Sequence, residues 1–330
     1  MQENKKAGIL RLLRETKEFV SGQELCERFS VSRTAVWKII RQLKEEGYEI
    51  EAVRNRGYRL LAMADIISQS ELESRLKDCW AGTRVFYAEE VDSTNTWAKR
   101  LAEEGAPHGT LVTADVQTQG RGRRGREWKT PKGTNVSMTL LLRPDLEPER
   151  ASMLTIIMGL SVAEGLRTMT GLPVGIKWPN DAVLNGRKLC GILTEMSAQI
   201  DYINYVVTGT GINVNLAEVP EGLEEIATSL LLETGHTFRR AEVIEAVARR
   251  FAENYESFMK TKDLSGLQEA YNKILVNKDQ AVRVLDQTAP YEGTALGIND
   301  RGELLVRRAD GTVSEVYAGE VSVRGLYGYV

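Results

Sequence analysis

The segment TLVTADVQTQGRGRRGREWKTPKGTNVSMTLLL, residues 110–142, decides the fold of the central part of the chain. From Gly120 to Gly125 its letters match G-x-G-x-x-G, the turn that holds a dinucleotide between a strand and a helix. The apolar residues before the glycines predict the strand, but residues 128–133 predict a loop and residues 135–142 a second strand. Because the helix is missing, the sequence excludes a dinucleotide-binding turn at this place.

The loop itself is basic and rich in glycine. Residues 119–128, QGRGRRGREW, contain four arginines and three glycines. This isolated cluster lacks the extended basic face that follows a nucleic-acid backbone, and the chain beyond residue 60 has a net charge of −7. Glycine gives mobility and close backbone approach, while guanidinium groups offer forked donors to phosphate or carboxylate. We therefore predict a loop that closes over one small anion; the alternative is an exposed basic loop without a ligand.

Length and composition indicate a soluble protein of about two or three domains, since single hydrophobic cores stop growing near ~250 residues and the chain has 330. Its 42% hydrophobic and 27% charged residues are typical of globular rather than disordered proteins. Residues 1–30 lack the apolar core and cleavage site of a secretory signal. The most apolar segment, residues 153–166, contains Glu164 and is shorter than the ~20 residues of a membrane span. It predicts a buried helix, and no membrane partner is expected.

Cysteine and histidine are scarce. Cys26, Cys79 and Cys190 are far apart and form no C-x-x-C pair, which indicates neither a disulfide framework nor a thiolate zinc site. This usage fits a reducing cytoplasm. With only His108 and His236, histidine metal sites and Ser-His triads lack the residues they need.

The basic part of the chain is its N-terminal segment. Residues 1–60 have a net charge of +4. Ser21 followed by Glu24 is a capping-box pattern that predicts a short helix through Phe29. After a break, SRTAVWKIIRQLKEEG at residues 32–47 has the apolar spacing of a second helix. Two helices joined by a short turn, the second one basic, predict a helix-turn-helix.

A hairpin follows these helices. Residues 48–61, YEIEAVRNRGYRLL, alternate as two strands around a basic tip, which is typical of the wing of a winged helix. Side chains on the second helix would reach base edges or phosphates in the major groove, and the wing arginines the backbone or minor groove. The predicted DNA contacts are Ser32, Arg33, Thr34, Lys38, Arg41, Arg54 and Arg56. The alternative is a helical module that binds protein, with charges that only solvate its surface.

These patterns divide the chain into three domains and predict an α+β multidomain fold. A new helix N-cap at Ser68 or Ser70 follows the wing, so residues 1–64 are predicted to form a winged helix-turn-helix domain. Residues 65–276 alternate between strands and helices and predict a mixed α/β domain. Residues 277–330 are short β segments with glycine turns, typical of a small β-barrel.

Four motifs of the central part together resemble one family. They are DSTN at 92–95, GRGRRGREW at 120–128, IKWPNDAVLNGRKLCGILTE at 176–195 and VVTGTGINVN at 206–215. In this order and at similar spacing they resemble the biotin protein ligases, and the winged helix narrows the resemblance to the bifunctional biotin ligase and biotin-operon repressor. The likeness covers nearly the whole chain. It implies a central domain of the biotin/lipoate ligase type, similar to class II aminoacyl-tRNA synthetases, and an SH3-like C-terminal barrel.

The resemblance implies a biotin–[acetyl-CoA-carboxylase] ligase reaction in two steps. Biotin and ATP with Mg2+ form biotinyl-5′-AMP and pyrophosphate, and the adenylate then acylates a lysine of a carrier such as the biotin carboxyl carrier protein. Biotin and ATP–Mg are substrates, and no bound prosthetic group is implied. Because the first step brings negative charges together, fixed cations suit it better than a nucleophilic side chain.

The resemblance also implies regulation through DNA. Bound adenylate would order the arginine loop and favour a homodimer, which would then bind operator DNA with two half-sites. Ordering of a segment that drives assembly is a known mode of switching.

Site residues carry over by position. The ligand-binding residues of the family correspond to Ser93, Thr94, Asn95, Gln117, Arg121, Gly122, Arg123, Trp128, Lys188 and Asn213, and its catalytic residues to Lys188, Arg121, Arg123 and Asp181. Lys188 matches a lysine at the junction of carboxylate and phosphate. Asp181 is expected to contact magnesium or to orient Lys188, and Asn213 to contact adenine or ribose.

Simpler roles and other functions remain open at this point. Ser93 and Asn95 could cap the following helix, and Lys188 alone would be an ordinary solvated turn residue. Lys177, Trp178 and Pro179 fit a structural turn. Two rival functions are a biotin-sensing repressor without catalysis and a lipoate or octanoate ligase. The complete arginine loop with Lys188 disfavours the first, and the GRGRRG and KWPND motifs disfavour the second.

Overall fold

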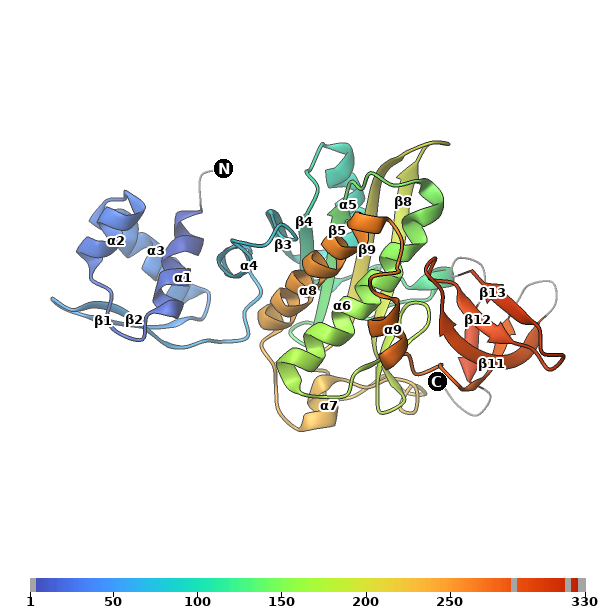
Figure 1. The fold of residues 1–330 in the computed structure, drawn as a ribbon. Helices are drawn as coiled ribbons and strands as arrows, with labels where there is room; N and C mark the ends of the chain where they lie inside the picture. Colours follow the sequence, from blue (N-terminus) through green and yellow to red (C-terminus); the bar gives the residue numbers. More distant parts are fainter. Residues whose placement is uncertain (1–3, 286–289, 318–321, 326–330) are drawn as a thin grey trace.

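Three parts of the chain follow one another across Figure 1, in the order of the sequence. The computed structural model describes residues 4–285, 290–317 and 322–325. The N-terminal part comprises α1 (Lys5–Glu15), α2 (Gly22–Phe29), α3 (Arg33–Glu45), β1 (Glu49–Val53) and β2 (Gly57–Ala62). β1 and β2 pair as an antiparallel hairpin after α3. The predicted winged helix-turn-helix is thus confirmed.

Local sequence signals explain the turn between its helices. The hydroxyl of Ser21 accepts a hydrogen bond from the backbone N–H of Glu24 at 3.0 Å, and that of Ser32 accepts one from Ala35 at 3.2 Å. Both serines therefore cap the helices that follow them. Ser30 takes a left-handed conformation with φ of 51°, which ends α2 and turns the chain into α3.

The central part is built on a seven-stranded sheet with the order β3-β4-β5-β9-β8-β7-β6. The strands are β3 (Arg84–Val91), β4 (Thr110–Gln117), β5 (Asn135–Leu142), β6 (Gly175–Lys177), β7 (Asp181–Leu184), β8 (Arg187–Ala198) and β9 (Ile203–Asn213). β3 and β4 are parallel, and every later neighbour pair is antiparallel. The glycines after β4 lead through a 3-10 turn, η1 (Arg123–Gly125), to β5, so the exclusion of a dinucleotide-binding turn is confirmed.

Helices cover both faces of this sheet. The elements are α4 (Gln69–Arg75), α5 (Thr94–Glu103), η2 (Pro148–Ser152), α6 (Met153–Thr170), α7 (Leu230–Thr234), α8 (Arg240–Thr261) and α9 (Gln268–Ile274). Leu111 of β4 packs in one cluster with α6 and α8, while the adjacent Val112 packs with α5. Successive side chains of a strand point to opposite faces, so α5 lies opposite α6 and α8. The apolar segment at residues 153–166 forms most of the buried α6, as predicted.

The C-terminal part is a five-stranded antiparallel sheet with the order β13-β12-β11-β10-β14. Its strands are β10 (Ala281–Leu285), β11 (Tyr291–Ile298), β12 (Leu304–Arg307), β13 (Val313–Val316) and β14 (Ser322–Gly325). The β segments expected here also take in residues 286 and 318–321, which lie outside the described residues.

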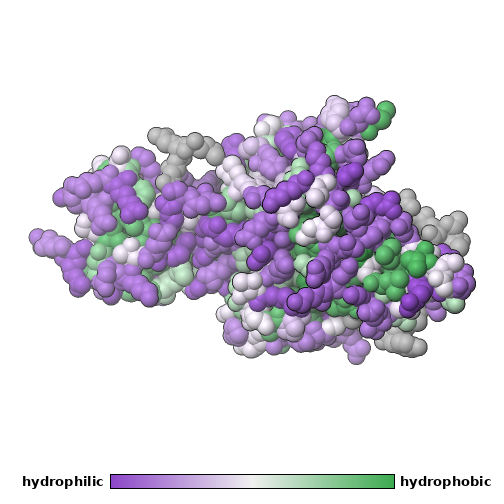
Figure 2. Space-filling model, in the orientation of Figure 1, coloured by the Kyte–Doolittle hydropathy of each residue, from purple (hydrophilic) through white to green (hydrophobic). Residues whose placement is uncertain are grey.

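The surface is mainly hydrophilic on the face drawn in Figure 2, and hydrophobic residues gather over the winged helix and beside the C-terminal sheet. Within the described ranges, no helix has the length and apolar character needed to cross a membrane.

Candidate active site

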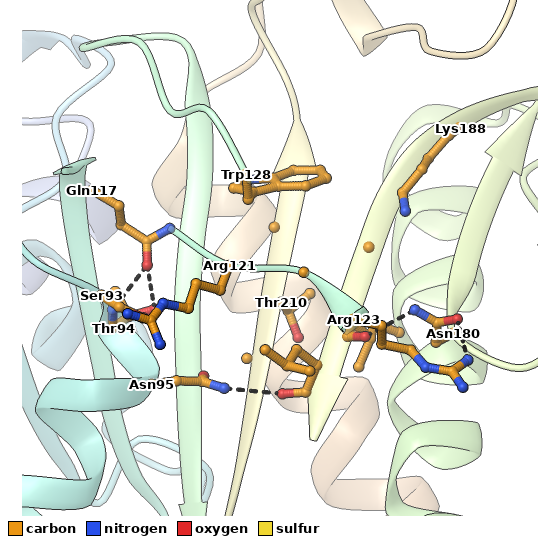
Figure 3. A pocket seen from close by; sticks show the side chains of 16 residues that line it. Ser93, Thr94, Asn95, Gln117, Arg121, Arg123, Trp128, Asn180, Lys188 and Thr210 are labelled. Carbon is orange, nitrogen blue, oxygen red and sulfur yellow. Dashed lines mark hydrogen bonds between the residues drawn. The ribbon is translucent and has the colours of Figure 1, made fainter. Parts of the chain in front are cut away.

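A hollow with an open volume of about 460 Å³ lies in the central part, at the ends of β3 and β4 and across β8 and β9 (Figure 3). Its lining residues are Ser93, Thr94, Asn95, Gln117, Arg121, Gly122, Arg123, Trp128, Asn180, Lys188, Gly191, Ile192, Leu193, Gly209, Thr210 and Gly211. Four sequence motifs that are far apart in the chain thus meet around one space.

One end of the pocket is rich in hydroxyl and amide groups, and Figure 3 draws the Arg121 guanidinium beside Ser93 and Thr94 there. The backbone N–H of Thr94, in the first turn of α5, donates to Oε1 of Gln117 at 2.8 Å, and its hydroxyl donates to the same oxygen at 3.1 Å. Nε2 of Gln117 donates to the hydroxyl of Ser137 at 3.2 Å. Ser93 is the N-cap of α5 but makes no side-chain capping bond, so the capping role considered for it is wrong. These hydroxyls and amides suit a small ligand with both donors and acceptors.

Asn95 is fixed between this end and the sheet. Its Oδ1 accepts from the hydroxyl of Thr139 at 2.8 Å, and its Nδ2 donates to Leu193 O at 3.1 Å and to Glu195 at 2.8 Å. A Cβ atom at Gly209 would lie 2.1 Å from Oδ1 of Asn95. Only glycine therefore leaves room on β9 for this side chain.

Bare backbone forms the floor of the pocket beneath Trp128. Gly191 of β8 and Gly211 of β9 are paired directly across the two strands. A Cβ atom at Gly211 would lie 2.3 Å from the indole of Trp128. The indole Nε1 is buried and has no hydrogen-bond partner among the described residues. The Trp128 ring thus packs over the glycines and covers this part of the pocket, and its indole N–H is a candidate donor to a ligand.

The opposite end of the pocket is cationic. The Arg123 guanidinium donates to Oδ1 of Asn180 at 3.1 Å (Figure 3). Asn180 is in turn held on β8, because it donates to Ile192 O at 3.0 Å and accepts from Ile192 N at 2.9 Å. Burial lowers the pKa of Arg123, the charge of Arg124 lowers it further, and Asp181 acts in the opposite direction. A bound anion would therefore stabilise the charged form of Arg123.

Lys188 also points into this end. Its Nζ forms an ion pair with Asp181 at 2.7 Å and lies 5.9 Å from the centre of the Trp128 ring. Its backbone is held by Ile226, whose carbonyl accepts from Lys188 N at 2.6 Å, and by Thr228, whose N–H donates to Lys188 O at 2.9 Å. The strand start is therefore rigid and presents the ammonium group toward the ligand space, as Figure 3 shows.

Asp181 is the carboxylate that pairs with Lys188 at this end. The described residues contain no group of three or more His, Cys, Asp or Glu side chains arranged to hold a metal ion. Mg2+ usually keeps several waters and binds through one or two carboxylates together with substrate phosphates. A magnesium ion at this place would thus arrive with ATP, as part of the substrate.

Nine of the predicted ligand-binding residues line the pocket together: Ser93, Thr94, Asn95, Gln117, Arg121, Gly122, Arg123, Trp128 and Lys188. Asn213 does not line it. Its Nδ2 donates to Thr228 O at 2.9 Å, and its Oδ1 accepts from Asn135 at 3.3 Å. The expected contact of Asn213 with adenine or ribose therefore has no support from its position, and the binding roles of the nine remain predictions.

Sequence reasoning missed several lining residues, namely Asn180, Gly191, Ile192, Leu193, Gly209, Thr210 and Gly211. Their motifs were recognised, but only Asp181, Lys188 and Asn213 of these two motifs were carried over as site residues. The alternation of Gly209, Thr210 and Gly211 on one strand was a usable signal, since glycine inside a strand often marks the close approach of a ligand or another group.

The predicted DNA contacts lie on the winged helix, apart from this pocket. Arg33, Thr34, Lys38 and Arg41 are exposed on α3, and Arg54 and Arg56 are exposed at the turn between β1 and β2. Ser32 is exposed and caps α3. The guanidinium carbon of Arg56 lies 4.3 Å from the centre of the Phe19 ring. Their contact with DNA remains a prediction.

Comparison with protein families assigns each of the three parts. Residues 87–213 match the biotin/lipoate A/B protein ligase family, residues 5–59 match an HTH domain, and residues 279–324 match the biotin protein ligase C terminal domain. Among solved structures, the biotin protein ligase from Aquifex aeolicus in complex with biotin and ATP superposes with a TM-score of 0.64 at 32% identity. It covers 73% of this chain and 99% of its own.

Relatives of similar length align with nearly the whole chain. The bifunctional ligase/repressor BirA of Bacillus spizizenii is 38% identical over 308 residues, which is 93% of this chain and 94% of the relative. The protein of the same name from Escherichia coli is 30% identical over the same shares of the two chains. The aligned residues therefore include the winged helix as well as the ligase part. The chain belongs to the family of the bifunctional ligase/repressor BirA.

Proposed function

We propose that this chain is an ATP-dependent biotin protein ligase that also represses transcription in response to biotin. The observation that carries the ligase role is the division of one pocket: an end with the hydrogen-bonding groups of Thr94 and Gln117, and an end where Arg123 and Lys188 point inward. A ligand with a ureido ring at one end and a carboxylate at the other matches that division. The Aquifex relative was solved with biotin and ATP, which supports the same ligands here.

In the first step a carboxylate oxygen of biotin attacks the α-phosphorus of ATP. A new O–P bond forms, the bond to the β-phosphate bridge breaks, and pyrophosphate leaves. All the reacting groups are anionic, so Lys188 and the loop arginines would lower the barrier by holding them together and stabilising the added charge. Asp181 orients the Lys188 ammonium through their 2.7 Å ion pair.

In the second step the amine of a carrier-protein lysine attacks the acyl carbon of biotinyl-5′-AMP. An amide bond forms, AMP leaves, and the amine loses its proton. The Trp128 cover and the arginine loop would keep water from the adenylate until the carrier protein arrives. A biotin carboxyl carrier protein of acetyl-CoA carboxylase is the proposed acceptor.

Exchange of labelled pyrophosphate into ATP tests the first step. Exchange is expected with biotin and not with lipoate, and exchange with lipoate only, or with neither, would contradict the proposal. Lys188→Ala should slow exchange about 10²–10³-fold, as the loss of one preorganised charged group does. Lys132→Ala is a matched control, because Lys132 is an exposed lysine outside the pocket lining.

Retention of the intermediate tests the loop. Arg123→Ala should leave the fold intact and let biotinyl-5′-AMP escape, since the guanidinium anchored on Asn180 would no longer hold the phosphate. The adenylate released into a filtrate measures this. Unchanged retention would remove Arg123 from the binding residues.

The repressor role rests on the winged helix. We propose that the loaded protein forms a homodimer that binds operator DNA with two half-sites, through the basic residues of α3 and the wing. A shift toward dimer in sedimentation when biotin and ATP are added is expected, and no shift would count against the dimer. The division at residues 1–64, 65–276 and 277–330 and the cytoplasmic location are parts of the same proposal.

A further inference from the structure

Trp37 stands on the outer face of α3 without a place in the core. Its exposed fraction is 55%, whereas Val36, Ile40 and Leu43 of the same helix are 3% exposed or less. The helix thus keeps its apolar stripe inside and presents a large aromatic ring to solvent. A single exposed apolar side chain needs no explanation, but a tryptophan in the middle of a helix expected to read DNA does.

The ring is held in place. The Arg41 guanidinium lies 5.1 Å from the centre of the Trp37 ring, one helical turn further along. Arg41 also forms an ion pair with Glu45 at 3.4 Å. This stack favours one orientation of the indole on the helix surface, so that less conformational entropy is lost when the ring makes a contact.

The charges around the ring indicate what it contacts. Within residues 33–41 the charged side chains are Arg33, Lys38 and Arg41, all exposed and all positive. A protein-binding aromatic residue is usually surrounded by a mixed polar rim. The charged residues of α3 up to Arg41 are thus all basic, and Glu45, which pairs with Arg41, follows one turn later. This basic surface complements a phosphate backbone, and the winged helix lies at the end of the molecule away from the C-terminal sheet (Figure 1).

We infer that Trp37 determines operator specificity by packing its indole against the C5-methyl group of a thymine in the major groove. The groove presents this methyl group as the one apolar feature among base-edge donors and acceptors. The flanking arginines and Lys38 place the helix through phosphate contacts, which carry no sequence information directly. The inference rests on the proposed operator binding.

The test begins with the full-length protein loaded with biotin and ATP. A duplex bound by this complex is selected from a random DNA library, and each of its thymines is then replaced by deoxyuridine, which lacks the methyl group. We expect about fourfold weaker binding at one thymine position in each half-site, the effect of burying one methyl group. Uniform binding across all deoxyuridine positions would overturn the inference.

Variants connect that position to Trp37. Trp37→Ala should bind the selected duplex at least about tenfold more weakly, comparable to one mismatched base pair, and should no longer distinguish thymine from deoxyuridine. Trp37→Phe should keep part of the discrimination. Leu61→Ala is the matched control, because Leu61 lies in the same domain, is also 55% exposed, and is on β2 near the linker. Trp37→Ala with the same deoxyuridine profile as the unaltered protein would overturn the inference.

Pyrophosphate exchange separates this inference from the proposed function. Trp37→Ala should exchange at the unaltered rate, which shows that the variant folds and loads its ligand. If the unaltered protein selects no duplex, the repressor proposal and this inference fail together. If it selects one that Trp37→Ala binds equally well, only the inference fails.

Discussion

The two ends of the chain join the central domain in opposite ways. The winged helix has a core of its own, which includes Leu10, Leu25 and Leu43. The described residues of the C-terminal sheet form no separate core, because its inward side chains, such as Val282 and Leu304, belong to the same buried cluster as α6 and α8. The winged helix is therefore a separate domain attached to the ligase domain, whereas the C-terminal sheet shares the core of the ligase domain.

Buried charged residues connect the winged helix to the central domain, and we call this contact the N-terminal junction. Glu71 of α4, 4% exposed, accepts hydrogen bonds from Arg14 at 2.8 Å, from the Tyr48 hydroxyl at 2.6 Å and from Nε of Arg75 at 2.5 Å. Arg75 reaches on to Glu245 of α8 at 2.9 Å. Such bonds are directional, so this junction fixes the orientation of the winged helix without merging the two cores.

Trp178 makes the C-terminal junction. It follows β6, is 1% exposed, and donates from its indole to Gly302 O at 3.0 Å. Its backbone N–H donates to Oδ1 of Asn277 at 2.8 Å. Asn180, which holds Arg123, comes two residues later in the chain. The segment that carries one wall of the active site is thus also the contact with the C-terminal sheet.

The contrast between the two junctions indicates that the DNA-binding part can be separated from the ligase core, whereas the C-terminal part cannot.

Truncation at either end gives the largest expected effect. Removal of residues 277–330 should abolish cooperative unfolding, because it opens the shared core around Trp178. Removal of residues 1–64 should leave a cooperatively unfolding domain, since the winged helix takes its own core with it. Urea denaturation followed by circular dichroism measures both. If both truncated chains unfold with the same cooperativity, the two ends do not differ in how they join the central domain.

Trp178→Ala should lower the free energy of unfolding of the full chain by about 3–5 kcal/mol, the usual cost of removing a buried tryptophan. The central and C-terminal parts should lose stability together, because the ring belongs to their common cluster. Trp37→Ala is the control, and as a surface substitution it should stay within about 0.5 kcal/mol. Stability lost only by the C-terminal part would show that the two cores are separate.

Local signals and remote contacts differ in how well the sequence predicts them. The starts of both helices of the helix-turn-helix can be predicted from Ser21, Glu24 and Ser32, because a helix cap joins residues only three positions apart. The pocket residues followed from motifs that resemble a family, not from local rules. The pair Arg75–Glu245 joins residues 170 positions apart, and each is an ordinary charged helix residue in the sequence. No periodicity marks such pairs, so the junctions became visible only in the fold.

Glu71→Ala should cost about 3 kcal/mol, because it leaves the Arg14 and Arg75 guanidinium groups buried without the carboxylate they share. The loss should be confined to the winged helix and α4. Hydrogen exchange of α1 amides, compared with that of β5 amides, measures this. Faster exchange in β5 to the same degree would mean that the junction stabilises the whole chain, contrary to the comparison. Asp78→Ala, at an exposed carboxylate three residues after the end of the same helix, is the control.

Tyr48→Phe is the smallest of these changes, expected at about 1 kcal/mol, because it removes one hydrogen bond while both arginines still compensate Glu71. Burial raises the pKa of Tyr48 well above its usual value of 10.0, and the charge of Glu71 raises it further. The protonated hydroxyl is therefore favoured in the folded chain, and its contribution is full below pH 10 and falls as the pH rises above that value. The free-energy difference between the unaltered chain and Tyr48→Phe should stay constant from pH 7 to 9 and shrink above pH 10. A difference that changes between pH 7 and 9 would show that a group other than Tyr48 controls this junction.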